Sequence, residues 1–594
     1  MHISQKMTRT VLHLTLAGTL ALPMAAGAAS TSADLDAKYE KLQQEMKDLK
    51  NQMQELKGTT EEKLTAVDEK AEKWDLASRF ELSGDFRSRL DYVSADTPEF
   101  YTANDIGNGV AGFYAFDFAD PVVQGNLGAL FGSVGITPTP EMFGQMMSLQ
   151  AGGMTTVPDF VSFMQQFTPA QRVGIFQGMG LGTAPESRYG NDSLWTNRFR
   201  LNIRAKAMEN VEFKGRLAMY KAWGMQNNPV DYTLAGGPFM LNSLSMDGNV
   251  SRIPTDSGLY VDRAFVNWNN VGGAPVWFSI GRRPTTDGPP TQFKQGRDER
   301  MATPVAYMDY AFDGISLGYA YQNLGGLPEA PGRVRICYGR GFESGPEVSS
   351  KGLKDTDFLG LSWDVYSKGS RFLNIQSFAA FDMFNVPDDV TFPNPLEQAF
   401  ASGNGTLDRT NLGNIYHTSA VYTDKVDGLN YFAAAGWSRT APNGQDEVGN
   451  GLLTSWWDKD YQAAKDGYSA YAGVRYDLAD LGLKLGLEYN YGSKNWIAFT
   501  PGNDDLYASK LAVRGHVGEA YMIWSIPGGE KISKFADAFI RLGYQHYLYN
   551  YTGSGFWLGE PQDIDDLKTD PLTAQFYTPV DSMDQVYLTF EATF

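Results

Sequence analysis

The run Arg79-Phe-Glu-Leu-Ser-Gly-Asp-Phe-Arg-Ser-Arg-Leu-Asp-Tyr92 has a period of two along its whole length. Phenylalanine, leucine, tyrosine or glycine takes nearly every second position, and charged or hydroxyl residues stand between them. Alternate side chains of a β-strand point to opposite faces of the sheet. The run therefore predicts a strand with one apolar face and one strongly charged face.

Three further stretches repeat the alternation: Trp195–Ala207, Val211–Met219 and the carboxy-terminal Val586–Phe594. A soluble sandwich would also alternate, but its strands usually have about 5–6 residues, and all three of these runs are longer. Aromatic residues gather near the ends of other alternating runs, as the girdles of a transmembrane barrel do; they are Tyr489, Tyr491, Trp496, Tyr549 and Tyr551. We predict an all-β, antiparallel transmembrane barrel over residues 79–594.

The apolar face of these runs is predicted to meet lipid. In the second run it includes Phe199, Leu201 and Ile203, and in the last run Phe590 and the terminal Phe594. We expect outer-membrane lipids to contact these five side chains, and we expect the barrel-assembly machinery to recognise the last strand, which ends at Phe594.

The number of strands follows less directly from the sequence than the strand pattern itself. Seventeen segments carry the strand pattern, among them 304–312 and 314–323. A bacterial single-chain barrel has an even number of strands. Short and long connections alternate when they are counted from the first strand, and also when they are counted back from the last strand. The two counts disagree between about 324 and 412. One strand missed there gives 18 strands, the expected number, and 16 is the alternative.

Two segments precede the barrel. In residues 1–28, basic residues, a short apolar run and Ala26-Gly27-Ala28 predict a cleaved signal peptide and export. Residues 34–74 carry leucines every seven positions from Leu35 to Leu56, which predicts a periplasmic coiled coil. A single helix cannot bury such a seam, so we expect a homo-oligomer through the coiled coil; a solvated spacer helix is the alternative.

A long insertion occupies residues 94–193, between the first two runs, and is rich in glycine, proline and methionine. Short helices are predicted at 141–149, 158–167 and 169–179. A connection of this length without a role is uncommon. We expect it to narrow the lumen or to cap the outer mouth, and a compact extracellular flap is the alternative.

Basic residues are concentrated on the polar face of the second and third runs, where alternation points them to the lumen: Arg198, Arg200, Arg204, Lys206, Lys214 and Arg216. Arg87 and Arg89 point the same way on the first run. There, Glu81, Asp85 and Asp91 share the face, and neutralisation is the favoured interpretation. A basic lumen concentrates anions and repels cations. These eight residues are therefore predicted to give the pore anion selectivity.

Composition and motifs exclude several other classes of protein. The net charge of −19 argues against nucleic-acid binding, and a single cysteine excludes a disulfide framework. The chain has no haem-attachment motif, no P-loop and no zinc-protease motif. Gly107-Asn-Gly109-Val-Ala-Gly112 matches a dinucleotide pattern only in its letters, because no strand precedes it. We predict no enzymatic activity, no metal and no cofactor.

A signal peptide, a heptad helix and the stretch 80–92 together resemble the opening of bacterial outer-membrane porins with an amino-terminal periplasmic coiled coil. Asp262-Arg263-Ala-Phe-Val-Asn-Trp268, followed by Gly281-Arg282, resembles the strand–turn–strand pattern of phosphate-selective porins. The body resembles a porin-like family of anaerobic bacteria. This resemblance implies a passive channel, often trimeric, in the outer membrane of a Gram-negative cell, and it transfers no binding residue.

The leading hypothesis is thus a porin for small hydrophilic solutes with a preference for anions. One alternative is a barrel sheath around a partner such as a multihaem cytochrome, for electron transfer across the outer membrane. Another is a structural tether between the outer membrane and the cell wall, in which the lumen is blocked.

Overall fold

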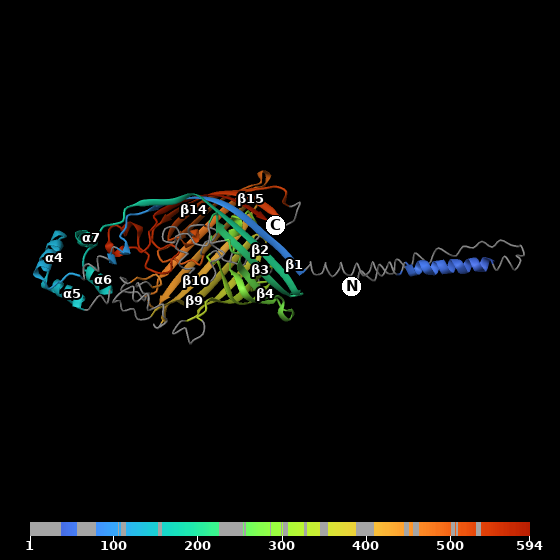
Figure 1. The fold of residues 1–594 in the computed structure, drawn as a ribbon, viewed down its shortest axis with the longest axis horizontal. Helices are drawn as coiled ribbons and strands as arrows, with labels where there is room; N and C mark the ends of the chain where they lie inside the picture. The colour runs from blue at the N-terminus through green and yellow to red at the C-terminus, as the bar shows by residue number, and fades with distance from the viewer. Residues whose placement is uncertain are drawn as a thin grey trace. The chain divides into compact units, whose positions relative to one another are not determined.

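The computed structural model describes residues 37–55, 57, 79–104, 106–107, 115–151, 157–224, 254, 257–285, 287–298, 300, 307–325, 329–344, 354–387, 409–444, 451–455, 463–500, 505, 509–529 and 536–594 (Figure 1). The chain divides into two units, Met1–Ser78 and Arg79–Phe594. Each unit is described by itself below.

The first unit contains a helix over residues 37–55. Five residues of the predicted seam lie on this helix and each is between 63% and 68% exposed: Tyr39, Leu42, Met46, Leu49 and Met53. The predicted signal peptide and the heptads beyond residue 57 lie outside the described residues. The helix has the seam of a coiled coil, and pairing with a second helix stays a prediction.

The second unit is a closed antiparallel barrel in which every strand pairs with its sequence neighbours and β1 pairs with β16. In the described part of the chain the barrel has 16 strands: β1 (Phe80–Thr97), β2 (Ser187–Met208), β3 (Val211–Ala222), β4 (Tyr260–Trp268), β5 (Val276–Thr285), β6 (Tyr310–Tyr321), β7 (Gly332–Phe342), β8 (Thr356–Lys368), β9 (Arg371–Pro387), β10 (Arg409–Val426), β11 (Leu429–Pro442), β12 (Asp466–Leu478), β13 (Leu483–Gly492), β14 (Gly515–Ser525), β15 (Asp537–Tyr549) and β16 (Ser582–Thr593).

The expectation of 18 strands is wrong, and the alternative of 16 is correct. The error lies at 304–312, which was counted apart from 314–323: its described residues 307–309 belong to none of the 16 strands, and residues 310–312 belong to β6 (Tyr310–Tyr321). Within this segment Met308 makes an isolated bridge to Phe499 and is buried. The described apolar residues Tyr307, Met308 and Tyr310 are buried inside the barrel and do not face lipid, so no further strand is needed between 324 and 412.

The seam between the first and last strands depends on Gly84. Its backbone N–H donates to the Phe594 carbonyl at 2.8 Å, and the Phe594 N–H donates to the Gly84 carbonyl at 3.0 Å. A Cβ atom on residue 84 would lie 2.5 Å from the Arg200 carbonyl oxygen and 2.6 Å from the Phe594 ring. Only glycine leaves room for this close approach of three strands.

The two faces of the barrel differ as the alternation predicts. Large apolar side chains at outward positions are exposed on most strands, for example Leu361 on β8, Leu487 on β13 and Leu588 on β16. Their neighbours Ser362, Glu488 and Thr589 are buried on the inner face. The sheet thus has an apolar outer surface and a polar, charged inner surface.

The described residues of the insertion between β1 and β2 include the helices α4 (Pro121–Ser133), α5 (Pro140–Ala151), α6 (Val157–Met164) and α7 (Pro169–Gly178). They share a core around Phe131, Phe163 and Phe176, and Arg172 of α7 donates to Asp570 in the β15–β16 connection at 2.8 Å. Figure 1 shows these helices grouped beyond one end of the strands. Constriction of the lumen or closure of its mouth by the insertion stays a prediction.

None of the helices among the described residues has the length and apolar character needed to span a membrane.

Candidate functional site

Charged side chains of both signs are buried in the barrel in equal numbers. With the helices of the β1–β2 insertion left aside, the described residues of the strands and of the other connections bury eleven basic side chains: Arg87, Arg89, Arg198, Arg200, Arg216, Lys294, Arg335, Arg475, Lys510, Arg514 and Arg541. They also bury eleven carboxylates: Asp85, Asp91, Glu212, Asp262, Asp309, Asp364, Asp424, Glu488, Asp505, Glu519 and Glu591. The basic excess of residues 194–216 is therefore compensated by carboxylates from elsewhere in the fold.

Arg198 and Arg200, two of the predicted selectivity residues, lie buried on the inner face of β2. Asp85 of β1 lies 3.2 Å from Arg198 and 2.8 Å from Arg200, and Glu591 of β16 lies 3.3 Å from Arg198. Strands that are adjacent in space but distant in sequence supply both carboxylates. The two arginines are parts of a buried ion-pair network.

Three more of the predicted residues lie nearer the end of the strands. Arg204 and Lys214 are about two-fifths exposed, and each lies 2.7 Å from Glu212. Arg204 also contacts Glu81 at 3.1 Å, and Lys206 is exposed. A surface group of this kind contributes little to stability and is screened by salt.

Arg87 and Arg89 are buried against aromatic rings of the neighbouring wall. Arg89 lies 2.8 Å from Asp91 and 4.4 Å from the Tyr587 ring centroid. Arg87 lies 5.4 Å from the Tyr220 ring centroid. Arg89 is thus neutralised by Asp91, as the favoured sequence interpretation has it, and both arginines gain cation–π contacts.

The five residues predicted to face lipid occupy the outward positions of β2 and β16. Phe590 is 42% exposed and Phe594 is 52% exposed. Phe199 stacks on Phe594 with ring centroids 6.5 Å apart, and Leu201 and Ile203 are half-buried. Contact with lipid remains a prediction for all five.

One carboxylate of the β5–β6 connection meets three arginines of the wall. Asp287 accepts from Nη1 of Arg200 at 3.2 Å, from Nη1 of Arg216 at 2.6 Å and from Nη2 of Arg263 at 2.9 Å. We call Arg200, Arg216 and Arg263 the arginine triad. It lies on β2, β3 and β4, so three consecutive strands converge on a single carboxylate.

A second group of charges fixes two connections to the opposite wall. Lys294 of the β5–β6 connection lies 2.8 Å from Glu519 of β14, and Lys510 of the β13–β14 connection lies 2.5 Å from the same carboxylate. Lys510 also pairs with Glu488 of β13, and the Tyr587 hydroxyl donates to Glu519 at 2.5 Å. We call Lys294, Lys510, Glu488 and Glu519 the lysine clamp. It holds both connections inside the barrel.

Aromatic residues of these connections pack against inward-facing residues of the strands. Phe499 lies 5.0 Å from Phe378 of β9 and 4.5 Å from Trp557 of the β15–β16 connection, centroid to centroid. Fifteen buried residues form this cluster. An apolar core inside the barrel means that the connections occupy a large part of the cross-section of the lumen.

Arg514, just before β14, joins two of the inward connections. Its partners among the described residues are backbone carbonyls and not a carboxylate. Its guanidinium donates to the backbone carbonyls of Trp496 at 3.3 Å, Thr552 at 3.1 Å, Gly553 at 2.6 Å and Phe556 at 2.7 Å. The side chain is fully buried. Burial lowers the pKa of Arg514 to about 9, so the guanidinium is still charged at neutral pH.

Sequence reasoning missed Asp287, Lys294, Lys510 and Glu519, and it did not identify Arg514. Glu519 alternates with small and apolar residues on β14, so the strand pattern could have placed it inward. The other four lie in connections, where no period indicates which way a side chain points. Among the described residues, no group of three or more His, Cys, Asp or Glu side chains is arranged to hold a metal ion.

A pocket of about 480 Å³ at the ends of β1 and β2 is lined by carboxylates, including Asp96, Glu186, Asp565 and Asp581. Burial, followed by the charges of Asp565, Asp96 and Glu186, raises the pKa of Asp581 above its usual value. An aspartate whose pKa is higher in the folded state than in the unfolded state destabilises the fold once the pH rises above its unfolded-state pKa.

We therefore expect Asp581→Asn to stabilise the protein at pH 7 by about 0.5 kcal/mol, as for other partly exposed charges. At pH 3, where both folded and unfolded protein are protonated at this carboxyl, the variant should match the wild type. Chemical unfolding at the two pH values measures the difference. Asp480→Asn, at an exposed turn, is the control and should change neither value; a gain for Asp581→Asn at pH 3 would contradict the electrostatic origin.

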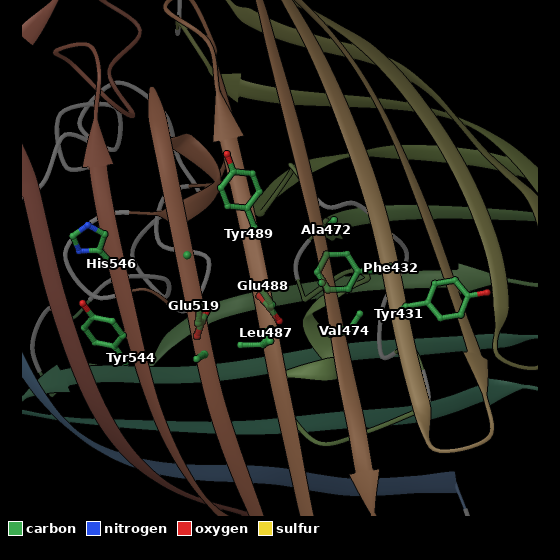
Figure 2. Close-up of a pocket in the computed structure, with 13 residues that line it drawn as sticks. Tyr431, Phe432, Ala472, Val474, Leu487, Glu488, Tyr489, Glu519, Tyr544 and His546 are labelled. Carbon is green, nitrogen blue, oxygen red and sulfur yellow. The ribbon is translucent and has the colours of Figure 1, made fainter.

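The outer wall has a shallow hollow over β11–β15, with a volume of about 680 Å³ (Figure 2). Small residues at outward positions form part of its lining, namely Ala472, Gly518 and Ala520, and Tyr489 and Tyr544 stand beside them. Glu488 on β13 and Glu519 on β14, both of the lysine clamp, lie behind this hollow and are buried on the inner side of the wall. The wall is thus thin where the clamp is attached.

Residues 188–594 match a family described as a protein of unknown function (DUF3373). No curated protein matches the chain. The match spans β2 to β16, that is, every strand except the first.

Several solved structures are similar to the chain at low identity. Pseudomonas putida OprB is 10% identical with a TM-score of 0.37, over 89% of this chain and 97% of that chain. The outer membrane channel DcaP of Acinetobacter baumannii is 10% identical with a TM-score of 0.36, over 87% and 97%. The outer membrane protein OmpT of Vibrio cholerae, in a trimer form, is 11% identical with a TM-score of 0.34, over 87% and 99%.

Proposed function

We propose that this chain, which belongs to the DUF3373 family of proteins of unknown function, is an outer-membrane channel for passive diffusion of small hydrophilic solutes. One observation carries the proposal: a closed barrel of 16 strands, apolar outside and charged inside. An apolar outer surface suits a bilayer, and a closed sheet leaves no unpaired edge in it. A polar inner face suits water and solutes.

The connections that fold into the barrel limit the size of the solute. The lysine clamp and the Phe499 cluster fill space beside β9 and β13–β14. A path for solutes must pass along the remaining wall, where Cys337 on β7 and Arg263 on β4 are partly exposed. We therefore propose a narrow channel rather than a wide aqueous pore.

Single-channel recording of the full-length protein in a planar bilayer tests the function. Under a salt gradient, we expect steady conductance at the low end of the range for barrels of 16 to 18 strands. Loss of the conductance on heating to the unfolded form is the control that assigns it to the folded barrel. A correctly folded protein that carries no current would contradict a channel function.

The anion preference inferred from the sequence is a finer proposal, and the burial of equal numbers of charges weakens it. Any preference must come from basic groups that water reaches, such as Arg263, whose side chain is 16% exposed. We propose weak anion selectivity for that reason, read from the reversal potential in the same recording. A cation-selective reversal potential would contradict the proposed anion selectivity.

The sheath for a partner protein would need an empty lumen. In the described residues the lumen holds Phe499, Trp557 and thirteen further packed residues, which argues against this alternative. The channel is therefore the function we propose. The packed connections also fit a structural tether, and a tether predicts no current in the recording described above.

Self-association through the heptad helix is a separate proposal. Exposed Leu42 and Leu49 occupy the seam that would face other copies. We expect Leu42→Lys/Leu49→Lys to weaken oligomer formation by at least tenfold, because paired lysines would repel at the seam. Native mass spectrometry of the detergent-solubilised protein gives the distribution of states. The matched control is Gln44→Lys/Asn51→Lys, which adds the same charge away from the seam; equal loss in both variants would contradict the seam.

A further inference from the structure

The inner wall of β5–β8 holds two arginines whose hydrogen bonds go to serine hydroxyls. Arg283 of β5 donates through Nη1 to the Ser279 hydroxyl. Arg335 of β7 donates through Nη2 to the Ser362 hydroxyl of β8 at 2.7 Å. We call Arg283 and Arg335 the arginine pair. A hydroxyl orients a guanidinium group but does not neutralise it, so the serines leave the charge of the pair in place.

The single cysteine of the chain lies beside both members of the arginine pair. In the register of the sheet, Ser279 stands opposite Ser316 of β6, and Ser316 stands opposite Cys337 of β7. The Cys337 thiol donates to the Ser316 hydroxyl at 3.5 Å and is partly exposed. It acts electrostatically on Arg283 and on Arg335. A row of small, neutral side chains thus connects the two guanidinium groups.

Positive charge predominates on this part of the wall. Asp364 of β8 lies 3.7 Å from Nη2 of Arg335, and it also accepts from Arg333 of β7. Arg300 of the β5–β6 connection is a further basic group near Asp364. In the part of the chain that the structure describes, no carboxylate acts on Arg283. Four arginines thus stand against one carboxylate.

The arginine pair has further N–H groups directed at the lumen. Within the described ranges, Arg283 and Arg335 donate one hydrogen bond each. Neither residue contributes a nitrogen to the buried side-chain atoms that lack a partner. The N–H groups that the serines do not bind therefore touch water. Several charged donors on one wall suit an ion with several acceptor oxygens, because guanidinium forks bind such oxygens in pairs.

We propose that the arginine pair is a binding site for a small oxyanion, such as a carboxylate or a sulfate, on the path of solutes through the barrel. This inference rests on the proposed channel function, because it names the class of solute that the channel takes. The ion lies against the wall over Cys337 and contacts both guanidinium groups. It offsets positive charge that Asp364 leaves, and binding involves no covalent step.

The cysteine reports on the site, because an ion bound over Cys337 blocks access to the thiol. The test is the rate at which N-ethylmaleimide modifies Cys337 in the folded full-length protein in detergent, measured by intact-protein mass spectrometry. This reagent is neutral, so the charge of the wall does not attract it. We expect saturating sodium sulfate or sodium acetate to slow the modification at least fivefold relative to sodium chloride at the same ionic strength. The oxyanion that protects at the lower concentration assigns the site to sulfates or to carboxylates.

Arg283→Gln and Arg335→Gln should each remove the protection, because one of the two guanidinium groups is gone. Arg340→Gln is the matched control and should keep it. This variant removes the same charge from β7 on the other face of the strand, where Arg340 lies 3.0 Å from Asp357 and 2.7 Å from Asp355. Heat-modifiability on gels verifies that each variant is folded, and the comparison of salts on the wild type decides the test if a variant does not fold.

Equal rates in sulfate, acetate and chloride would overturn the site, and so would protection that persists in both glutamine variants of the pair. A folded wild type in which Cys337 does not react, although the unfolded chain reacts, would also overturn it, because water would not reach this wall. Planar-bilayer recording of the same preparations separates the site from the channel function. Protection without any current supports the site and contradicts the channel, and current without protection supports the channel and overturns the site.

Discussion

Glu519→Ala should lower the stability of the barrel by about 3–5 kcal/mol and raise its single-channel conductance severalfold. The carboxylate is 1% exposed and lies within 2.8 Å of both Lys294 and Lys510. Removing one member of a buried ion pair leaves its partner charged without compensation, which costs this much. Lys510 keeps its pair with Glu488, whereas the remaining carboxylate near Lys294 is Asp505 at 3.6 Å. We therefore expect Lys294 and the β5–β6 connection to move away from β14, and that movement opens the lumen.

Chemical unfolding in detergent and planar-bilayer recording measure the two effects. Glu519→Gln removes the charge but keeps an acceptor for the Tyr587 hydroxyl, so it separates the ionic contribution from the hydrogen bond. Glu329→Ala, whose side chain is 81% exposed beside Lys368, is the control and should behave as the wild type. Unchanged stability and conductance in Glu519→Ala would mean that the lysine clamp does not hold the connections.

Arg514→Ala should have the second-largest effect, because four carbonyl oxygens of two connections lose their donor together. Hydrogen bonds from a charged donor contribute about 1.5–3 kcal/mol each, and buried carbonyls without a donor add a penalty. We expect a loss of at least about 3 kcal/mol and cleavage near residues 551–557 by a protease that leaves the wild type intact. Arg514→Lys should rescue only part of this, because lysine lacks the planar fork.

Limited proteolysis followed by mass spectrometry locates the new cleavage site. The control is Arg439→Ala on β11, where a 45% exposed guanidinium pairs with Asp466 at 2.7 Å. Cleavage at 551–557 in both variants, or in neither, would contradict a role for Arg514 in joining the connections.

The strands could be predicted because burial imposes a period on them. In β2 the alternation of Phe199, Leu201 and Ile203 with Arg198 and Arg200 follows from the two faces of the sheet. The same rule failed at 304–312, where apolar residues serve an interior cluster, and the count came out too high. Alternation reports that one side is apolar, and it does not report whether lipid or a packed core covers that side.

The chemistry of the lumen could not be predicted in the same way. Arg198, Arg200 and Arg216 were placed inward by their period, but their partners Asp85, Asp262, Asp287 and Glu591 come from other strands or from a connection. Which strands close on each other, and which connection folds inward, depends on the whole fold. A net charge counted along one segment therefore says little about the electric field inside a closed barrel.

The contact of Gly84 with Phe594 bears on when the barrel can close during folding. Because the sheet closes by pairing β1 with β16, it has two open edges until β16 is in place. Open strand edges invite pairing with other chains. We therefore expect a chain that lacks its last twelve residues to form an open sheet with unpaired edges and not a slightly smaller barrel. Such a chain should aggregate rather than show reduced activity.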